Sequence, residues 1–119
     1  DRLALGLALY GRGFPVSEPY TPLPKGSKVI DLNARDVPRR IAEGWTRVWD
    51  DETKVPWLIS SDGTKVAGYD DEESMRLKTE WAMSKGLRGV FFWQIDGDRF
   101  PDGSNPLQKS AHDAWSARK

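Results

Sequence analysis

The side chains best placed for chemistry follow an apolar run at residues 89–93. Trp93 closes this run, and Asp96 and Asp98 come shortly after it. A continuous apolar run is typical of a parallel strand that is covered on both faces, and the polar residues after such a strand lie at the open carboxyl end, where these sheets place their sites. Trp93 is therefore predicted to lie where a ligand binds, although a lone tryptophan more often fills a core.

A second apolar run, at residues 3–10, is followed by the segment Gly11-Arg12-Gly13-Phe14. With this run the order of elements becomes strand, long excursion, helix, strand, helix. Two parallel strands joined in this way require a crossover connection. The order of elements predicts a piece of an α/β protein.

The middle of the chain has a different pattern. Short β segments are predicted at 46–49, 55–60 and 64–69, and Asp62-Gly63 favours a type I′ turn and hence an antiparallel hairpin between the last two. Pro56 favours an edge position for its strand. Because this block is antiparallel while the flanking runs suit a parallel sheet, it predicts a small α+β insertion between two elements of a larger sheet.

Three helices are predicted from their end signals. A short one spans about 36–43, a longer one begins in the carboxylate run at 70–73 and ends at Gly86, and the last begins at Asn105-Pro106. The acidic run at 70–73 suits the positive end of a helix dipole, so we interpret it as a helix start and not as a site. The proline-rich stretch from 14 to 31 is predicted to be an extended surface loop.

Composition excludes several classes of function. Eighteen basic residues balance eighteen acidic ones, so no field would attract nucleic acid or a membrane surface. Without cysteine and with His112 as the single histidine, the usual zinc sites and nucleophile pairs cannot form, and we expect no metal and no cofactor. Neither an apolar stretch of ~20 residues nor a signal peptide is recognisable. The abundant aromatic residues favour a sugar-like or protein ligand.

Four segments, which together extend over nearly the whole chain, carry a family resemblance. They are Tyr10-Gly11-Arg12-Gly13-Phe14, RVWDDETKVP at 47–56, GYDDEES at 68–74 and GVFFW at 89–93. In this order and spacing they resemble the C-terminal part of a glycoside hydrolase family 18 chitinase. The resemblance implies an α+β chitinase insertion domain, with an antiparallel sheet and a helix, flanked by a β-α-β-α fragment of a (β/α)8 TIM barrel. Residues 1–12 would be a barrel strand fragment, 13–69 the insertion domain, and 70–119 the barrel helix, last strand and C-terminal helix.

The resemblance also implies what the chain lacks. In this family the acid that protonates the leaving oxygen belongs to a D-x-x-D-x-D-x-E motif after the fourth barrel strand, and the acetamido group of the substrate attacks the anomeric carbon. No segment of this chain has that motif. We therefore expect no catalytic residue in this chain and no hydrolysis by it alone. The parent enzyme is expected to be secreted and to cleave β-1,4-linked N-acetylglucosamine polymers with retention, and the remainder of the barrel is the expected partner.

For the substrate, chitin or N-acetylglucosamine oligosaccharides, the resemblance implies five contact residues. Trp93 would form the floor under the sugar at the scissile bond, while Tyr10 and Arg12 end the other barrel strand. Arg12 is predicted to donate hydrogen bonds to hydroxyl or acetyl oxygens, or else to form a structural ion pair. Arg47 would reach the cleft from the insertion domain, and Trp45 would stack on a further sugar unless it belongs to a small satellite core.

Two alternatives remain open from the sequence. The chain also suits a non-catalytic, chitinase-like carbohydrate-binding protein whose upstream acid has been lost. It suits a protein-interaction module as well, because small α+β domains of this kind serve as docking surfaces.

Overall fold

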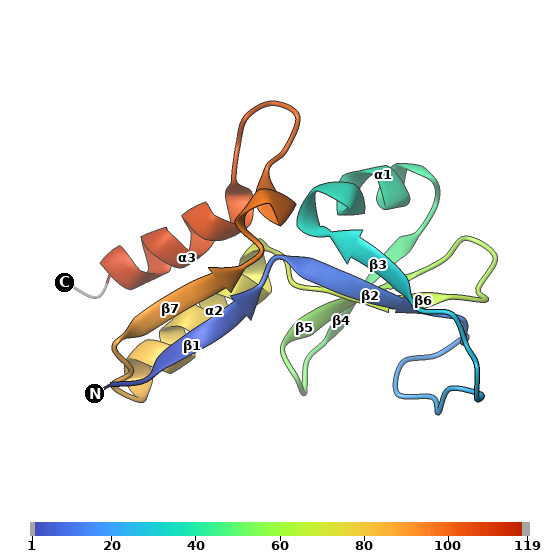
Figure 1. Ribbon diagram of the computed structural model, residues 1–119, viewed down its shortest axis with the longest axis horizontal. Helices are drawn as coiled ribbons and strands as arrows, with labels where there is room; N and C mark the ends of the chain where they lie inside the picture. The colour runs from blue at the N-terminus through green and yellow to red at the C-terminus, as the bar shows by residue number, and fades with distance from the viewer. Residues whose placement is uncertain (1, 118–119) are drawn as a thin grey trace.

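The computed structural model describes residues 2–117, which form two sheets and their helices (Figure 1). Strands β1 (Ala4–Ala8) and β7 (Gly89–Trp93) pair in parallel, with Ala4 opposite Gly89 and Ala8 opposite Trp93. The other strands form an antiparallel sheet in the order β3-β2-β6-β5-β4. They are β2 (Tyr10–Phe14), β3 (Ile30–Asn33), β4 (Thr46–Asp50), β5 (Val55–Ile59) and β6 (Val66–Gly68). The predicted parallel pairing of the two apolar runs is confirmed.

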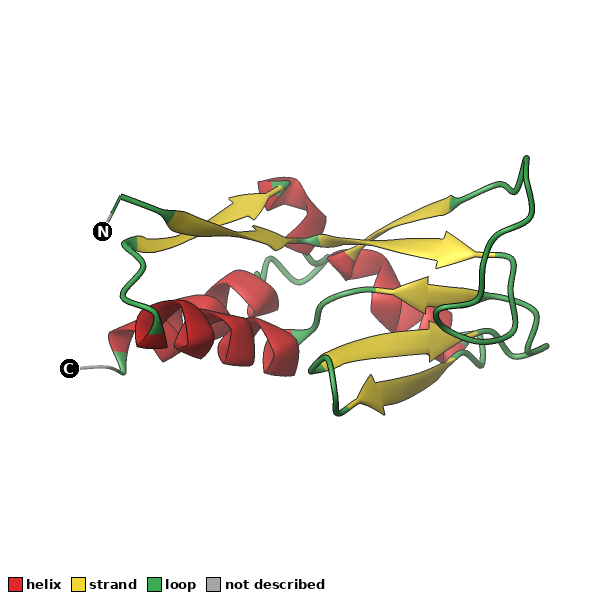
Figure 2. Ribbon diagram, turned by 90° about the horizontal axis from the view of Figure 1, so that it is seen from below, coloured by secondary structure: helices red, strands yellow, loops and turns green. Residues whose placement is uncertain are grey.

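Two long helices lie side by side along one face of the β1–β7 pair (Figure 2). They are α2 (Glu72–Ser84) and α3 (Pro106–Ser116), and the shorter helices are η1 (Ala34–Asp36), α1 (Val37–Ala42) and η2 (Ile95–Asp98). The core between this sheet and its helices contains Leu7, Leu9, Ala34, Met75, Leu107 and Ala111. None of the helices within residues 2–117 is long and apolar enough to cross a membrane.

The ends of α2 follow from local chemistry. The side chain of Asp71 accepts a hydrogen bond from the Ser74 amide at 3.0 Å, and Ser74 Oγ accepts one from the Asp71 amide at 2.9 Å. Such a capping box satisfies two amides that the first helical turn leaves unpaired, and its cap contributes about 1 kcal/mol. Gly86 adopts a φ of +68°, and the Leu87 amide donates to the Ala82 carbonyl at 3.0 Å. The predicted helix start and end are confirmed.

A second core lies between the antiparallel sheet and α1. Its buried members are Leu32, Leu58, Ala67 and Tyr69, and Ile30, Val37 and Trp45 pack against them. Burial raises the pKa of Tyr69 to about 12, with a further contribution from the charge of Asp71. The Tyr69 hydroxyl is therefore neutral at physiological pH.

The first apolar run is not one strand. β1 stops at Ala8, and Tyr10 begins a strand of the antiparallel sheet, so the prediction of a single strand over 3–10 is wrong at its end. Leu9 lies between the two sheets and is fully buried. Its amide donates to the Trp93 carbonyl at 2.8 Å, and its carbonyl accepts from the Ala34 amide at 3.0 Å. Leu9 thus pairs with both sides at the point where the chain passes from one sheet to the other.

Two expectations about strands also need correction, as does one about a hairpin loop. β3 lies at the end of the segment 14–31 that was predicted to be loop, where apolar and polar residues alternate from Ile30 to Asn33. β5 is an inner strand, contrary to the edge position predicted from Pro56. Proline is accommodated there because β6 ends at Gly68, opposite Trp57, so that Pro56 lies beyond the paired part of that neighbour.

The loop of the β5–β6 hairpin is longer than predicted. The Ser60 amide pairs with the Lys65 carbonyl at 2.9 Å, which leaves a four-residue loop at 61–64 in place of a two-residue turn. Asp62 closes this loop, because its carboxylate accepts hydrogen bonds from Ser60 Oγ at 2.7 Å and from the Thr64 amide at 3.0 Å. Hydrogen bonds to the Asp62 side chain thus hold the loop closed, in place of the backbone conformation of a type I′ turn.

Candidate functional site

A pocket of about 300 Å³ lies where the two sheets meet. β7 supplies Trp93, and Gln94 follows it. The antiparallel sheet supplies the remaining lining residues, which are Tyr10, Gly11 and Arg12 from β2 and Asp31, Leu32 and Asn33 from β3. The pocket exists because β1 continues through Leu9 into β2, so the end of the parallel pair and the start of the antiparallel sheet are neighbours (Figure 1). The structure therefore brings Trp93, Tyr10 and Arg12 to one hollow.

Trp93 does not fill the core of the described chain. Strand residues alternate between faces, and Phe92 packs against the core beneath the helices, so Trp93 faces the other side. Its side chain is 67% exposed. A second hollow of about 510 Å³ adjoins it, lined also by Ile95, Asp96 and Arg99 among others. The Trp93 indole thus lines both hollows. The peptide bond between Trp93 and Gln94 is cis.

The antiparallel pairing of β2 with β3 arranges the polar groups of the pocket. Arg12 lies directly opposite Asp31, and its Nη1 contacts Asp31 Oδ1 at 3.2 Å. The Arg12 guanidinium also lies 5.8 Å from the centre of the Tyr10 ring. The ion pair that was one of the two predictions for Arg12 therefore exists, but both side chains are exposed, and such surface pairs contribute 0–1 kcal/mol. Because a guanidinium has five N–H groups and this bond uses one, Arg12 retains donors for a ligand.

The two carboxylates after Trp93 have different environments. Asp98 is fully buried and accepts hydrogen bonds from the amides of Leu107 at 3.1 Å and Gln108 at 2.9 Å. These are amides of the first turn of α3, so Asp98 anchors that helix. Asp96 lines the larger hollow, and its backbone carbonyl accepts a hydrogen bond from Arg35 Nη1 at 2.6 Å. Asp98 therefore has a structural role in this chain.

The other two predicted site residues lie elsewhere. Arg47 binds the carboxylates of Asp71 and Glu73 at the start of α2. Trp45 packs against the second core, with the Arg40 guanidinium 5.4 Å from its ring. Neither residue lines the Trp93 pocket, and their contact with sugar stays a prediction.

Three polar lining residues escaped the sequence reasoning. Asp31 and Asn33 belong to β3, and the alternation of apolar and polar residues there was a usable signal for a strand. Gln94 follows Trp93 directly, and no pattern distinguished it from the rest of the segment. Within residues 2–117 no cluster of His, Asp or Glu has the arrangement of a metal site.

The chain belongs to glycosyl hydrolases family 18, because the sequence profile of that family matches residues 1–98. Chitinase A1 of Niallia circulans is 34% identical over 122 residues, which cover 90% of this chain and 17% of that protein. The solved structure of chitinase ChiA74 from Bacillus thuringiensis superposes with a TM-score of 0.81 at 26% identity, covering 98% of this chain and 23% of the other.

Two further solved structures resemble this chain, and their names describe one as a chitinase and the other as a chitinase-like agglutinin. A plant class V chitinase mutant from Cycas revoluta in complex with (GlcNAc)3 has a TM-score of 0.75 at 26% identity, covering 94% of this chain and 33% of the other. The chitinase-like agglutinin RobpsCRA from Robinia pseudoacacia has a TM-score of 0.71 at 30% identity, covering 94% of this chain and 32% of the other. The chain spans only a minor part of each of these proteins.

Proposed function

We propose that this chain is the C-terminal part of a chitinase barrel together with its insertion domain, and that it forms one side of a cleft that binds N-acetylglucosamine polymers. In this proposal β1 and β7 are the last two strands of a (β/α)8 barrel, and α2 and α3 belong to the outer helical layer. The insertion domain, expected at residues 13–69, begins instead at Tyr10, because β2 belongs to the antiparallel sheet. The parent enzyme is secreted, and the remainder of its barrel is the partner of this chain.

The observation that carries the proposal is the shared pocket of Trp93, Tyr10 and Arg12 at the carboxyl ends of two parallel strands. Barrel enzymes build their sites at that end. A flat, exposed indole matches the apolar CH face of a pyranose ring, and the guanidinium of Arg12 supplies donors for hydroxyl and acetyl oxygens. These groups bind and orient a sugar without themselves supplying an acid.

The chemistry that we assign to the parent enzyme is hydrolysis with retention by the substrate-assisted route. The acid of the D-x-x-D-x-D-x-E motif is then encoded outside this chain. Asp98 is an unsuitable substitute because it is fully buried and engaged by the amides of α3. The chain holds the substrate while another part of the barrel protonates the leaving oxygen.

The relatives support this assignment at the level of substrate class. Chitinase A1 carries the activity in its name, and the Cycas revoluta chitinase was solved with (GlcNAc)3. The Robinia pseudoacacia neighbour, a chitinase-like agglutinin, favours a second candidate function, a non-catalytic carbohydrate-binding protein. Both candidates use the same pocket, and they differ in whether the parent retains the upstream acid.

The test is a titration of (GlcNAc)3 into the isotope-labelled chain, followed by amide and indole NMR signals. We expect shifts confined to Trp93, Tyr10, Arg12 and their neighbours, with an affinity on the order of 1 mM, equivalent to about −4 kcal/mol. We also expect the chain alone to release no shorter sugars. Shifts centred elsewhere would contradict the assigned pocket, and cleavage by the chain alone would contradict the absence of a catalytic acid.

A further inference from the structure

The Trp93 pocket is shared by two separate bodies of the fold, so its shape depends on how they are oriented. One body is the parallel layer, made of β1, β7, α2 and α3. The other is the antiparallel sheet. Trp93 comes from the first, whereas Tyr10, Arg12 and Asp31 come from the second. A tilt of the sheet about its inner strands moves the β3 residues Asp31 and Asn33 relative to Trp93.

The covalent connections leave one direction of tilt unrestrained. The chain crosses between the bodies twice, from β1 to β2 at Leu9 and from β6 to α2 at residues 69–71. β2 and β6 are neighbours in the order β3-β2-β6-β5-β4. Both crossings therefore attach to adjacent inner strands, and rotation about a line along them would raise one edge of the sheet while lowering the other. Contacts away from that line, at β5 and at the two edges, restrain the rotation.

The β3 edge, which lines the pocket, is held close to the pocket itself. Ala34, directly after β3, donates its amide to the Leu9 carbonyl at 3.0 Å. Arg35 Nη1 donates to the Asp96 carbonyl at 2.6 Å. These two bonds, one of the backbone and one of an exposed side chain, hold the residues after β3 and not the strand itself.

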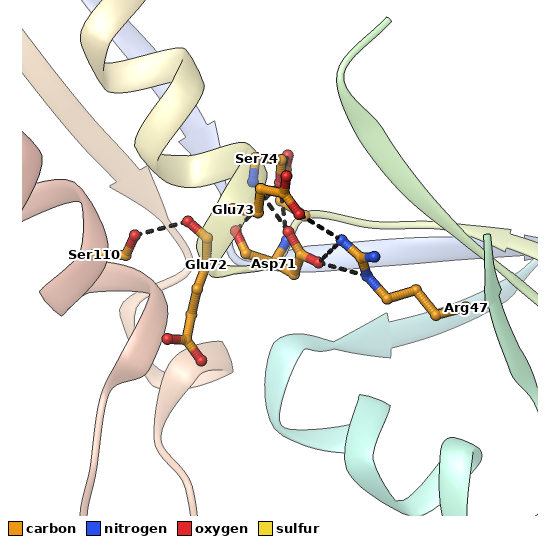
Figure 3. A network of polar contacts seen from close by, with 7 residues as sticks. Arg47, Asp71, Glu72, Glu73, Ser74 and Ser110 are labelled. Carbon is orange, nitrogen blue, oxygen red and sulfur yellow. Dashed lines mark hydrogen bonds and ion pairs between the residues drawn. The ribbon is translucent and has the colours of Figure 1, made fainter. Parts of the chain in front are cut away.

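The opposite edge, β4, is held by Arg47 (Figure 3). Its Nη2 contacts Asp71 Oδ2 at 2.8 Å and Glu73 Oε2 at 3.1 Å, while its Nε donates to Asp71 Oδ2 at 2.9 Å. The guanidinium also lies 5.1 Å from the centre of the Trp49 ring. The turn between β4 and β5, together with β1 and α2, borders a hollow of about 430 Å³, lined by Thr53, Lys54 and Trp81 among others. Packing alone therefore leaves space for the edge to move.

We infer that Arg47 is a positioning residue, which fixes the tilt of the antiparallel sheet on the parallel layer and thereby the placement of the β3 residues Asp31 and Asn33 against Trp93. The residue at the other end of the contact is itself rigid, because Asp71 is the N-cap of α2 and is fixed by its reciprocal bonds with Ser74. Ser110 Oγ in turn joins α3 to the Glu72 carbonyl of the same first turn at 2.7 Å. Arg47 thus connects the β4 edge to a well-anchored point of the parallel layer.

The geometry gives the size of the effect. Neighbouring strands lie about 4.8 Å apart, so β4 is roughly 12 Å and β3 roughly 7 Å from a line between β2 and β6. A rise of about 2 Å at β4 therefore lowers β3 by about 1 Å. β2, which carries Arg12, lies only roughly 2 Å from that line and moves by about 0.4 Å. The displacement of β3 is enough to separate a ligand group from an Asp31 or Asn33 oxygen at hydrogen-bond distance.

The inference rests on the proposed function for its ligand, but not for its structural readout. We would compare Arg47→Met with the wild-type chain by residual dipolar couplings of the backbone amides, which report the orientation of the sheet relative to α2, and by titration with (GlcNAc)3. We expect a changed orientation together with binding at least about fivefold weaker. Asp71→Asn should act in the same direction, since asparagine still caps the helix but loses the charge. Arg47→Lys should be intermediate, because a lysine cannot contact two carboxylates as a fork.

The matched control is Arg39→Met, which also removes one positive charge and an exposed ion pair, in this case to Glu43, the residue directly after the same short helix. It should leave both readouts at the wild-type value. An unchanged orientation in both Arg47→Met and Asp71→Asn overturns the inference. Weaker binding with an unchanged orientation overturns it too, because Arg47 would then contact the sugar itself. If the wild-type chain binds no (GlcNAc)3, the proposed function fails, while the couplings still decide the role of Arg47. Should Arg47→Met not fold, Asp71→Asn and Arg47→Lys supply the same comparison.

Discussion

Truncation of the exposed indole, Trp93→Ala, tests the binding surface most directly. The side chain is 67% exposed, so its removal takes little buried area from the core, and we expect the free energy of unfolding to change by no more than about 0.5 kcal/mol. Binding should respond differently. A pyranose that covers ~60 Å² of apolar indole gains about 1.5 kcal/mol at ~25 cal/mol/Å². Loss of that contact corresponds to an affinity about tenfold weaker.

The assay is the (GlcNAc)3 titration, read at the amides of β2 and β3 because the indole signal is absent from the variant. Trp81→Ala is the matched control. Trp81 is also an exposed tryptophan, at 52%, but it lies on α2 away from the pocket. We expect the control to bind like the wild-type chain. If Trp93→Ala bound (GlcNAc)3 with undiminished affinity while both proteins stayed folded, stacking on this indole would be refuted.

Two further predictions concern carboxylates outside the pocket. Asp50 has a pKa of about 2, chiefly because the Tyr20 hydroxyl donates to it at 2.6 Å. Tyr20→Phe should therefore raise that pKa toward 3.8, as measured by carboxyl carbon NMR. In the wild-type chain the folded pKa of Asp50 is lowered, so the stabilisation is complete above pH 3.8 and is lost as the pH falls toward 2. The edge-on contact of Tyr20 with Trp57 should loosen over the same pH range. A Tyr20→Phe protein with an unshifted Asp50 would contradict this. Asp98→Ala should lower the free energy of unfolding by about 2–3 kcal/mol in urea, because two amides at the start of α3 lose a buried acceptor. Asp98→Asn, which keeps one acceptor oxygen, should lose less, and equal losses would argue against amide capping.

The helices of this chain were predictable because their ends depend on neighbouring residues. Asp71, Ser74 and Gly86 supply the start and end of α2 through bonds within a few residues. The parallel pairing of β1 with β7 was predictable from another local pattern. A continuous apolar run on each side of a helix is typical of parallel strands that are covered on both faces.

Strand boundaries and strand positions were less predictable. Nothing local in the run from Leu3 to Tyr10 marks the change of sheet at Leu9, because its two backbone bonds go to Trp93 and Ala34, both distant in sequence. Pro56 was assigned to an edge from its missing N–H, but the length of the neighbouring β6 decides whether that N–H is needed. Both outcomes depend on partners that a local pattern does not contain.

The sequence by itself determined the types of side chain available for a site. It identified a tryptophan at the end of one apolar strand, an arginine after another, and no usual metal or nucleophile set. The tertiary structure decided which of these residues meet. Trp93, Tyr10 and Arg12 line one pocket because the chain passes between sheets at Leu9, whereas Arg47 is bound by carboxylates 24 and 26 residues away. Local interactions depend on residues that are neighbours in the sequence, whereas a pocket at the junction of two sheets depends on how those sheets pack.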